Sequence, residues 1–383
     1  MFQQVMVSCL ALWLSAAAVP AGAQTRPAAS REAELGRGWQ ALSDGRPAIA
    51  GEIAGRLQLA HPGDHDVASL SIAAALAGAG PVRALDTYEA WLEASTREDP
   101  FLLDDIGMGH LAPLSKHENA GIRFAALAAM ARNGDTAAGK AIAAADAASL
   151  TVEADAALAR AGHAAAVSRL AARITAGGPQ DKSAAIEALR DTGQPGVVDA
   201  IATALTDPAP PSRITAALAL AELGAREALP RLRAAAADPE PAVRGIVAVA
   251  LGLLGDPEHR DDVAALATSP LGDYRLLHLR GEARNEASGL GWVGPAEALL
   301  KHDDPAVRIG AAELLMTQGR FTTAAPVLMA ALDDPSAPTR LIAARILPRL
   351  AVSERALPLL RKALRDRLPE VQVEAARALL IRR

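Results

Sequence analysis

The chain of 383 residues has a net charge of −5 and is 51% apolar, while only 3% of its residues are aromatic. This acidic balance and the scarcity of stacking side chains argue against a nucleic-acid partner, which needs a basic surface. The only cysteine, Cys9, lies near the N-terminus, so the rest of the chain offers no disulfide, thiolate nucleophile or cysteine-ligated metal. Much of the apolar content is alanine, which favours helix.

Residues 1–23 have the pattern of a secretory signal peptide. An apolar run over residues 5–19 is followed by a proline and by Ala21-Gly22-Ala23, which fits the small-x-small cleavage rule. We predict cleavage before Gln24, a flexible leader over residues 24–30, and a bacterial protein exported to the periplasm or the extracellular space. The run is about 15 residues, short for a membrane span, so we expect no stable span after cleavage. An uncleaved anchor is the alternative, since the segment before the run lacks lysine and arginine.

Residues 31–98 differ in pattern from the later chain and predict helical hairpins. Gly45 and Gly80 occupy similar segments 35 residues apart, close to the tetratricopeptide period. The turn at residues 61–64, sequence HPGD, stands where that family has its inter-repeat proline turn. The segment therefore resembles a degenerate tetratricopeptide hairpin with a further helix. A proline-bracketed junction over residues 99–115 separates it from the repeats that follow.

A helix predicted over Asp238–Gly255 has copies on both sides. Its apolar residues recur at the i, i+3, i+4, i+7 spacing of one helix face, and its last glycine can end the helix in a left-handed conformation. The copies share a spacing of 11 residues between an early polar or basic residue and the terminal glycine: Arg123 and Gly134, Thr151 and Gly162, Lys182 and Gly193, Arg213 and Gly224, Arg244 and Gly255, Arg308 and Gly319. A second apolar segment follows each glycine. This pattern predicts an all-α protein, an α-solenoid of stacked helical hairpins.

The strings DPEPAVRGIVAVALGLLG, DDPAVRIGAAELL and DRLPEVQVEAARALL resemble the HEAT repeat, in the short bacterial form related to phycobilisome-lyase repeats. The resemblance covers residues 116–383 and implies about eight repeats plus a terminal half-repeat. Members include scaffolds, adaptors, bilin lyases and DNA glycosylases, so it implies architecture and not one function. It also implies that the recurring arginines pair between layers with acids of the repeat turns: Arg213, Arg244, Arg308 and Arg340, with Asp207, Asp238, Asp304 and Asp334.

No motif of enzyme chemistry appears in the chain. HExxH, P-loop, GxGxxG and GxSxG patterns are all absent from the sequence, so we expect no catalytic residue and no cofactor. His61 and His65 lie beside two aspartates and form the most metal-like cluster by composition. Because a Pro-Gly turn separates these histidines, they do not share a helix face, and we expect no metal site.

One repeat, residues 269–303, departs from the pattern. Moving the core positions forward by 31 residues places His278, Gly281, Glu282 and Asn285 where the preceding repeat has apolar residues. Polar groups in a core are costly unless satisfied, so the helix should end early, rotate or open a polar pocket. We predict a polar concavity within residues 269–294, with these candidate binding residues: Tyr274, His278, Arg280, Arg284, Asn285 and Trp292. Decay of the repeat without a function is the alternative.

Two functions remain open at this point. The leading hypothesis is a non-enzymatic, exported scaffold or adaptor that binds a protein or peptide along the solenoid surface. The alternative is a small-ligand-binding protein or lyase-like enzyme with its site in the degenerate repeat, where His278 or Glu282 would act as acid or base. The chain stops one helix after Asp366, so we also expect an uncovered apolar side near Leu379 that could serve self-association.

We predict that the exported protein begins at Gln24 and contains no free thiol. The intact mass of the secreted protein, before and after treatment with a thiol-alkylating reagent, measures both properties. A mass that includes Cys9, or a mass increase on alkylation, would contradict the predicted cleavage.

Overall fold

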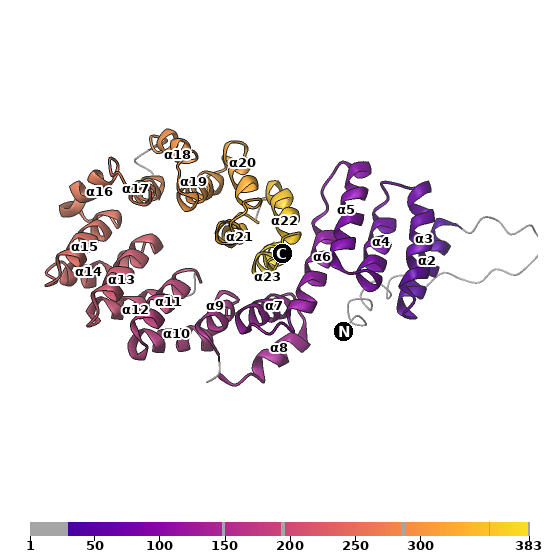
Figure 1. Cartoon of the computed structure of the whole chain (residues 1–383), viewed down its shortest axis with the longest axis horizontal. Coiled ribbons are helices and arrows are strands. Elements are labelled where there is room, and N and C mark those ends of the chain that lie inside the picture. Colours follow the sequence, from indigo (N-terminus) through magenta and orange to yellow (C-terminus); the bar gives the residue numbers. More distant parts are fainter. Residues whose placement is uncertain (1–29, 148–149, 193–195, 285–288, 352, 382–383) are drawn as a thin grey trace, which may run out of the picture. The chain divides into compact units, whose positions relative to one another are not determined.

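A computed structural model describes residues 30–147, 150–192, 196–284, 289–351 and 353–381. Every regular element in these ranges is a helix, which confirms the predicted all-α class. The chain divides into two compact units, Met1–His110 and Leu111–Arg383 (Figure 1). Within the described ranges, no helix combines the length and the apolar character needed to cross a lipid bilayer. The signal peptide and leader predicted for residues 1–30 lie, apart from Ser30, outside these ranges.

The first unit is a stack of helices that pack in chain order: α2 (Arg31–Ser43), α3 (Pro47–Ala60), α4 (His65–Gly78) and α5 (Pro81–Ser95). Its core is formed by apolar side chains from three of them, including Leu35, Ile53 and Leu70. The division between the units falls inside α6 (Pro100–Leu114). The likeness of this unit to tetratricopeptide repeats stays a prediction.

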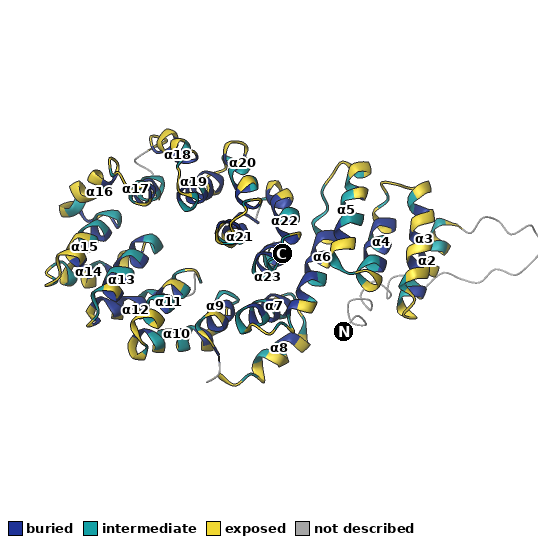
Figure 2. Cartoon of the chain, in the orientation of Figure 1, coloured by how far each residue is buried: buried dark blue, intermediate teal, exposed yellow. Residues whose placement is uncertain are grey.

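The second unit is a series of helical hairpins, as the solenoid prediction requires. The first helices of successive hairpins are α7 (Ala120–Arg132), α9 (Val152–Arg160), α11 (Pro179–Arg190), α13 (Pro210–Leu223), α15 (Pro241–Leu253), α17 (Gly272–Arg284), α19 (Pro305–Thr317), α21 (Ala337–Leu350) and the terminal α23 (Pro369–Ile381). The second helices are α8 (Thr136–Ala143), α10 (Ala164–Ala176), α12 (Val197–Thr203), α14 (Leu229–Ala235), α16 (Arg260–Leu266), α18 (Val293–Leu299), α20 (Phe321–Ala331) and α22 (Leu357–Leu364). Short 3-10 turns lie at Ala204–Thr206, Arg226–Ala228, Pro257–His259 and Glu354–Ala356. Second helices such as α8 and α16 are largely exposed (Figure 2).

The local structure of α15 follows its sequence, with one correction at its start. Val243, Val247 and Leu251 are completely buried, as the periodicity predicted. The chain leaves the helix through Gly255, whose φ of 89° is the left-handed conformation that glycine adopts without strain. The helix begins at Pro241 and not near Asp238, because the Asp238 carboxylate instead accepts the backbone N–H of Glu240 and forms the preceding turn.

A repeated ionic contact ties successive repeats together. Arg213 donates from Nε to the Asp238 carboxylate of the next repeat at 2.7 Å, and from Nη1 to the carbonyl oxygen of Asp207 in its own turn at 2.8 Å. Arg340 makes the same contacts with Asp366, at 2.7 Å, and with the carbonyl oxygen of Asp334, at 2.9 Å. We call this arrangement the turn clasp. Lys182 and Asp207 form a third example, which also ties one repeat to the next turn.

The turn clasp confirms the architectural role of the arginines but corrects the pairing for two of them. Arg244 donates to the carbonyl oxygens of its own turn, while the residue in the clasp position of the next turn is Ser269. Asp304 is not a clasp acid: its carboxylate accepts the N–H of Ala306, as a turn aspartate does, but none of the described basic residues pairs with it. Among the described residues, Arg308 likewise has no carboxylate partner and donates only to carbonyl oxygens of its own turn.

The second unit curls so that its last helix reaches its first. Helix α23 packs against α7 as well as against α21 and α22 (Figure 1). Glu374 of α23 also lies 3.7 Å from Arg160 of α9, in an ion pair. Val371, Ala375 and Leu379 are therefore completely buried. The expectation of an uncovered apolar side on the terminal half-repeat is wrong, because α7 covers it. Self-association through this half-repeat stays a prediction.

We predict that Arg213→Ala lowers the thermal midpoint by at least about 4 °C, because it removes a clasp carboxylate partner and two carbonyl contacts. Arg244→Ala is the matched control: the same register position without a carboxylate partner should shift the midpoint by less than about 2 °C. Equal shifts in circular-dichroism melts would show that the clasp adds nothing beyond the arginine's own turn.

The clasp also predicts a pH dependence. The hydrogen bond from Arg213 lowers the pKa of Asp238 below its ordinary value of 3.8. A carboxylate whose pKa is lower in the folded chain stabilises the fold above its ordinary pKa, and this stabilisation is lost as the pH falls through the lowered value. The difference in midpoint between the wild type and Arg213→Ala should therefore be constant between pH 5 and 8 and shrink below about pH 3.5. A difference unchanged at low pH would contradict the ionic clasp.

Candidate binding site

The stack of first helices loosens between α15 and α17. Helix α13 packs along α15, and α17 packs on α19, but α15 and α17 share little contact. They meet where Gly281 lies beside Leu253, since a Cβ atom on this glycine would come within 2.8 Å of the leucine side chain. The positions that bury Val247 and Leu251 in α15 hold polar residues in α17, which explains the poor packing.

Helix α17 itself is intact and presents a different face to the core. It runs over 13 residues to Arg284, so the expectation that it ends early is wrong. Its buried side chains are Leu276, Leu277 and Leu279, whereas His278 and Glu282, at the positions carried forward from α15, are only half-buried. Helix α17 is thus rotated about its axis relative to α15, so that its polar residues lie outside the core. Rotation was one of the outcomes that the sequence predicted.

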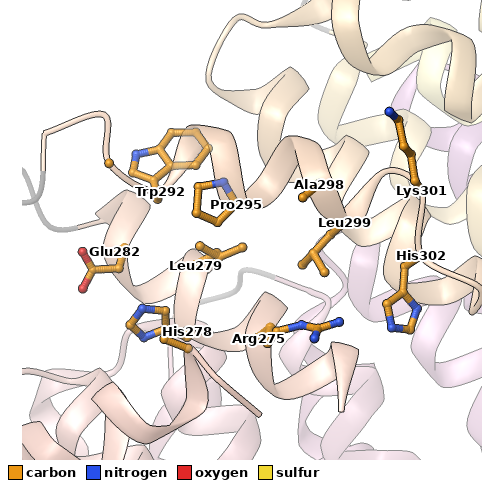
Figure 3. Close-up of a pocket in the computed structure, with 12 residues that line it drawn as sticks. Arg275, His278, Leu279, Glu282, Trp292, Pro295, Ala298, Leu299, Lys301 and His302 are labelled. Carbon is orange, nitrogen blue, oxygen red and sulfur yellow. The ribbon is translucent and has the colours of Figure 1, made fainter. Parts of the chain in front are cut away.

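A cleft of about 460 Å³ opens beside this rotated helix, between α17 and α18 (Figure 3). Its apolar part is formed by Leu279, Trp292 and Leu299, each 5% exposed, and by Pro295 and Ala298. Its polar part is formed by Arg275, His278, Glu282, Lys301 and His302. The volume lies in the range of small-ligand pockets and also accommodates one or two side chains of a peptide.

Two nitrogen atoms in the cleft wall are buried without a hydrogen-bond partner among the described residues. They are Nε of Arg275 and Nδ1 of His278. A buried polar atom without a partner costs roughly 1–3 kcal/mol, so native proteins keep few of them. No ion pair among the described residues involves Arg275, Lys301 or Glu282. The cleft therefore carries an unused donor on Arg275, an unpaired ring nitrogen on His278 and, among its described residues, an excess of positive charge.

The other predicted site residues do not join this cleft. Arg280 and Arg284 line a second hollow, where Arg280 pairs with Glu313 at 3.0 Å and Arg284 donates to the carbonyl oxygen of Ala221, at the end of α13, at 2.9 Å. Burial lowers the pKa of Arg284, and the charge of Arg280 lowers it further. These arginines thus attach α17 to α19 and α13, and the prediction that they belong to one concavity with His278 is wrong.

Of the remaining candidates, Trp292 lines the same cleft as His278. Tyr274 is half-buried and does not line it. Asn285 lies outside the described residues. Sequence reasoning missed Arg275, Lys301 and His302 as cleft residues, although a signal was available. In the repeats before and after, the aspartate of the turn lies six positions before the recurring arginine of the first helix, which we call the register arginine. The same spacing counted back from Arg308 leads to residue 302.

The described residues hold no group of three histidine, cysteine, aspartate or glutamate side chains placed to bind a metal ion. His278 and Glu282 are one helical turn apart on α17 and both border the cleft (Figure 3). The arrangement can hold a ligand through its cationic and apolar parts, and it offers one histidine and one carboxylate.

One comparison with known proteins supports the repeat architecture. A family model of HEAT repeats matches residues 198–280, which confirms the repeat type predicted from the sequence. This match ends inside α17, at the degenerate repeat. No curated protein matches the chain significantly. Solved structures that match include the complex of CpcE and CpcF of phycocyanin lyase from Nostoc sp. PCC7120, with 17% identity, 70% of this chain and 94% of that chain covered, and a TM-score of 0.35.

We predict that His278→Val raises the free energy of unfolding by about 1 kcal/mol, because it removes a buried nitrogen without a partner and restores the apolar residue of the neighbouring repeat. The control is the reverse type of substitution, Val247→His, at the corresponding position of α15. Val247 is completely buried. This substitution should lower the free energy of unfolding by about 2 kcal/mol or more. Denaturant melts measure both, and a clear loss of stability in His278→Val would mean that this histidine is structural.

Proposed function

We propose that the chain is a non-enzymatic repeat scaffold that docks a segment of a partner protein in the cleft between α17 and α18. The observation that carries the proposal is the cleft itself, which combines an apolar wall around Trp292 with two buried nitrogen atoms that lack partners. A site that keeps destabilising polar groups beside a buried aromatic residue is typical of binding surfaces, where a partner satisfies them.

The surroundings of the cleft support docking of a peptide segment. Pro295 and Ala298 are exposed at its edge, so a chain can enter from solvent without opening the fold. Solenoids commonly bind extended segments because their surface is continuous over several repeats. The inner contacts of Arg280 and Arg284 hold α17 in place from the other side, which supports a preformed site.

We also propose that this scaffold is exported and acts in a bacterial periplasm or outside the cell. The support is the apolar run at residues 5–19 with its small-residue cleavage site, together with the absence of cysteine from the remainder of the sequence.

A second candidate is a small-molecule site, with or without chemistry. The observation that favours it is the placement of His278 and Glu282 on the same wall of the cleft, where they could exchange a proton with a bound molecule. Native mass spectrometry of the purified protein distinguishes this candidate, because a stoichiometric small molecule would remain bound in the gas phase and be lost in Ala298→Trp.

We predict that the full chain selects peptides from a displayed random library, and that Ala298→Trp abolishes the selection because an indole at this position fills the cleft. Ala265→Trp is the matched control, since Ala265 is exposed on the neighbouring second helix, α16, and does not line the cleft. It should select the same peptides as the wild type.

Both variants change exposed alanines, so melting curves should coincide with that of the wild type within about 2 °C. If no peptide is enriched on the wild-type chain, or if both tryptophan variants select equally well, docking in the cleft is refuted.

A further inference from the structure

The turn clasp is missing at the cleft, and this absence indicates what the cleft binds. In each described clasp, a basic residue of one repeat meets the aspartate of the next turn: Lys182 with Asp207, Arg213 with Asp238, and Arg340 with Asp366. The turn aspartate also accepts the N–H of the residue two positions later, as Asp238 does from Glu240 at 2.9 Å. The contact with this N–H therefore identifies the clasp position even in a repeat that lacks the ionic contact.

His302 occupies the clasp position that faces Arg275. Its Nδ1 accepts the N–H of Asp304 at 3.1 Å, which reproduces the turn contact of Asp238. Its carbonyl oxygen accepts Nη1 of Arg308, as the carbonyl oxygen of Asp238 accepts Nη1 of Arg244. Because Nδ1 is an acceptor, a neutral His302 carries its hydrogen on Nε2. A histidine in this position makes the turn but provides no carboxylate for the arginine.

Arg275 is left with donors that none of the described residues satisfies. Its one hydrogen bond to these residues runs from Nη1 to the carbonyl oxygen of Ser269, at 3.3 Å, and its Nε is buried without a partner among them. Among the described register arginines, Arg275 alone has an unsatisfied buried Nε. Figure 3 shows its guanidinium group directed along the cleft toward His302. Asp304 does not compensate, because its carboxylate accepts the N–H of Ala306 and forms no ion pair with Arg275.

The neighbouring side chains favour an anion with an apolar part. Lys301 adds a second permanent positive charge, and the described residues that line the cleft include one carboxylate, that of Glu282. Leu279, Trp292 and Leu299 lie a short distance along the same cleft. An ion pair in such a partly desolvated site is stronger than at a flat surface, and an arginine presents a planar fork that matches a carboxylate.

We propose that the cleft recognises an aspartate or glutamate side chain of the docked segment, whose carboxylate takes the clasp position beside Arg275. An apolar side chain adjacent to this acid packs against Trp292. The inference rests on the proposed docking function and adds its specificity: the partner completes a contact that the repeat makes internally elsewhere.

The test is a pair of peptide selections on the full chain, one with the wild type and one with His302→Asp. The substitution restores the missing turn aspartate, so Arg275 gains an internal partner. On the wild type we expect an aspartate or glutamate at one fixed position next to an apolar residue, and a synthetic Glu→Gln or Asp→Asn peptide should bind at least about 10-fold more weakly. On His302→Asp the acidic position should disappear from the selected sequences.

Melting curves test whether His302→Asp folds, and the thermal midpoint of this variant should equal or exceed that of the wild type. Arg275→Gln is the second variant: it removes the charge without adding a carboxylate and should also lose the acidic preference. Arg244→Gln is the control, since Arg244 also lacks a clasp acid but lies outside the cleft, and it should select the wild-type sequences.

The possible results separate the two ideas. Enriched peptides without an acid, or an acid preference that survives both His302→Asp and Arg275→Gln, refute carboxylate recognition while leaving docking intact. Failure of the wild type to enrich any peptide refutes docking and carboxylate recognition together.

Discussion

The contact between a basic residue of one repeat and the turn of the next is the constraint on which the second unit depends. Its core layers are thin, since many of the buried residues are alanines that leave little side-chain volume to interlock. Such packing alone orients successive repeats only weakly. The clasp orients them more strictly, because a planar guanidinium group fixes both the distance and the orientation of the next turn. Where the clasp is present, as between α13 and α15, the first helices pack closely along each other.

The degenerate repeat lacks this constraint and also carries polar residues at the core positions of α17. Ser269 and His302 replace aspartate at the turns before α17 and after α18, and α17 packs little against α15. Contacts on the inner side hold the repeat instead, through Arg284 to the end of α13 and Arg280 to Glu313. These contacts thus hold the repeat on one face, and the cleft lies on the other. This asymmetry creates the cleft without a large departure from the helical hairpin.

The sequence predicted the parts of the fold that depend on neighbours in the chain. The spacing from Arg244 to Gly255 defined the repeat because it reflects one helix and its end, which are local structures. The approach of α23 to α7 was missed, since it results from small rotations accumulated over many repeats and no single residue encodes it. Within the site, Arg280 and Arg284 follow His278 by two and six positions, a spacing that places them on another face of α17. Helix periodicity therefore already contained this separation, which the grouping by composition overlooked. The importance of Arg275 emerged only from comparing contacts between repeats.

The meeting of α7 and α23 changes how this solenoid can vary. An open stack tolerates the gain or loss of a unit, because a new layer needs to fit only the two layers beside it. Here an added or deleted hairpin would also shift the last helix away from the first and expose Leu379 and its buried neighbours. The repeat number is therefore constrained as a whole, like the strand number of a closed barrel. For the same reason, a connection made between these two helices, with new ends cut in another loop of the second unit, should leave the architecture of that unit unchanged.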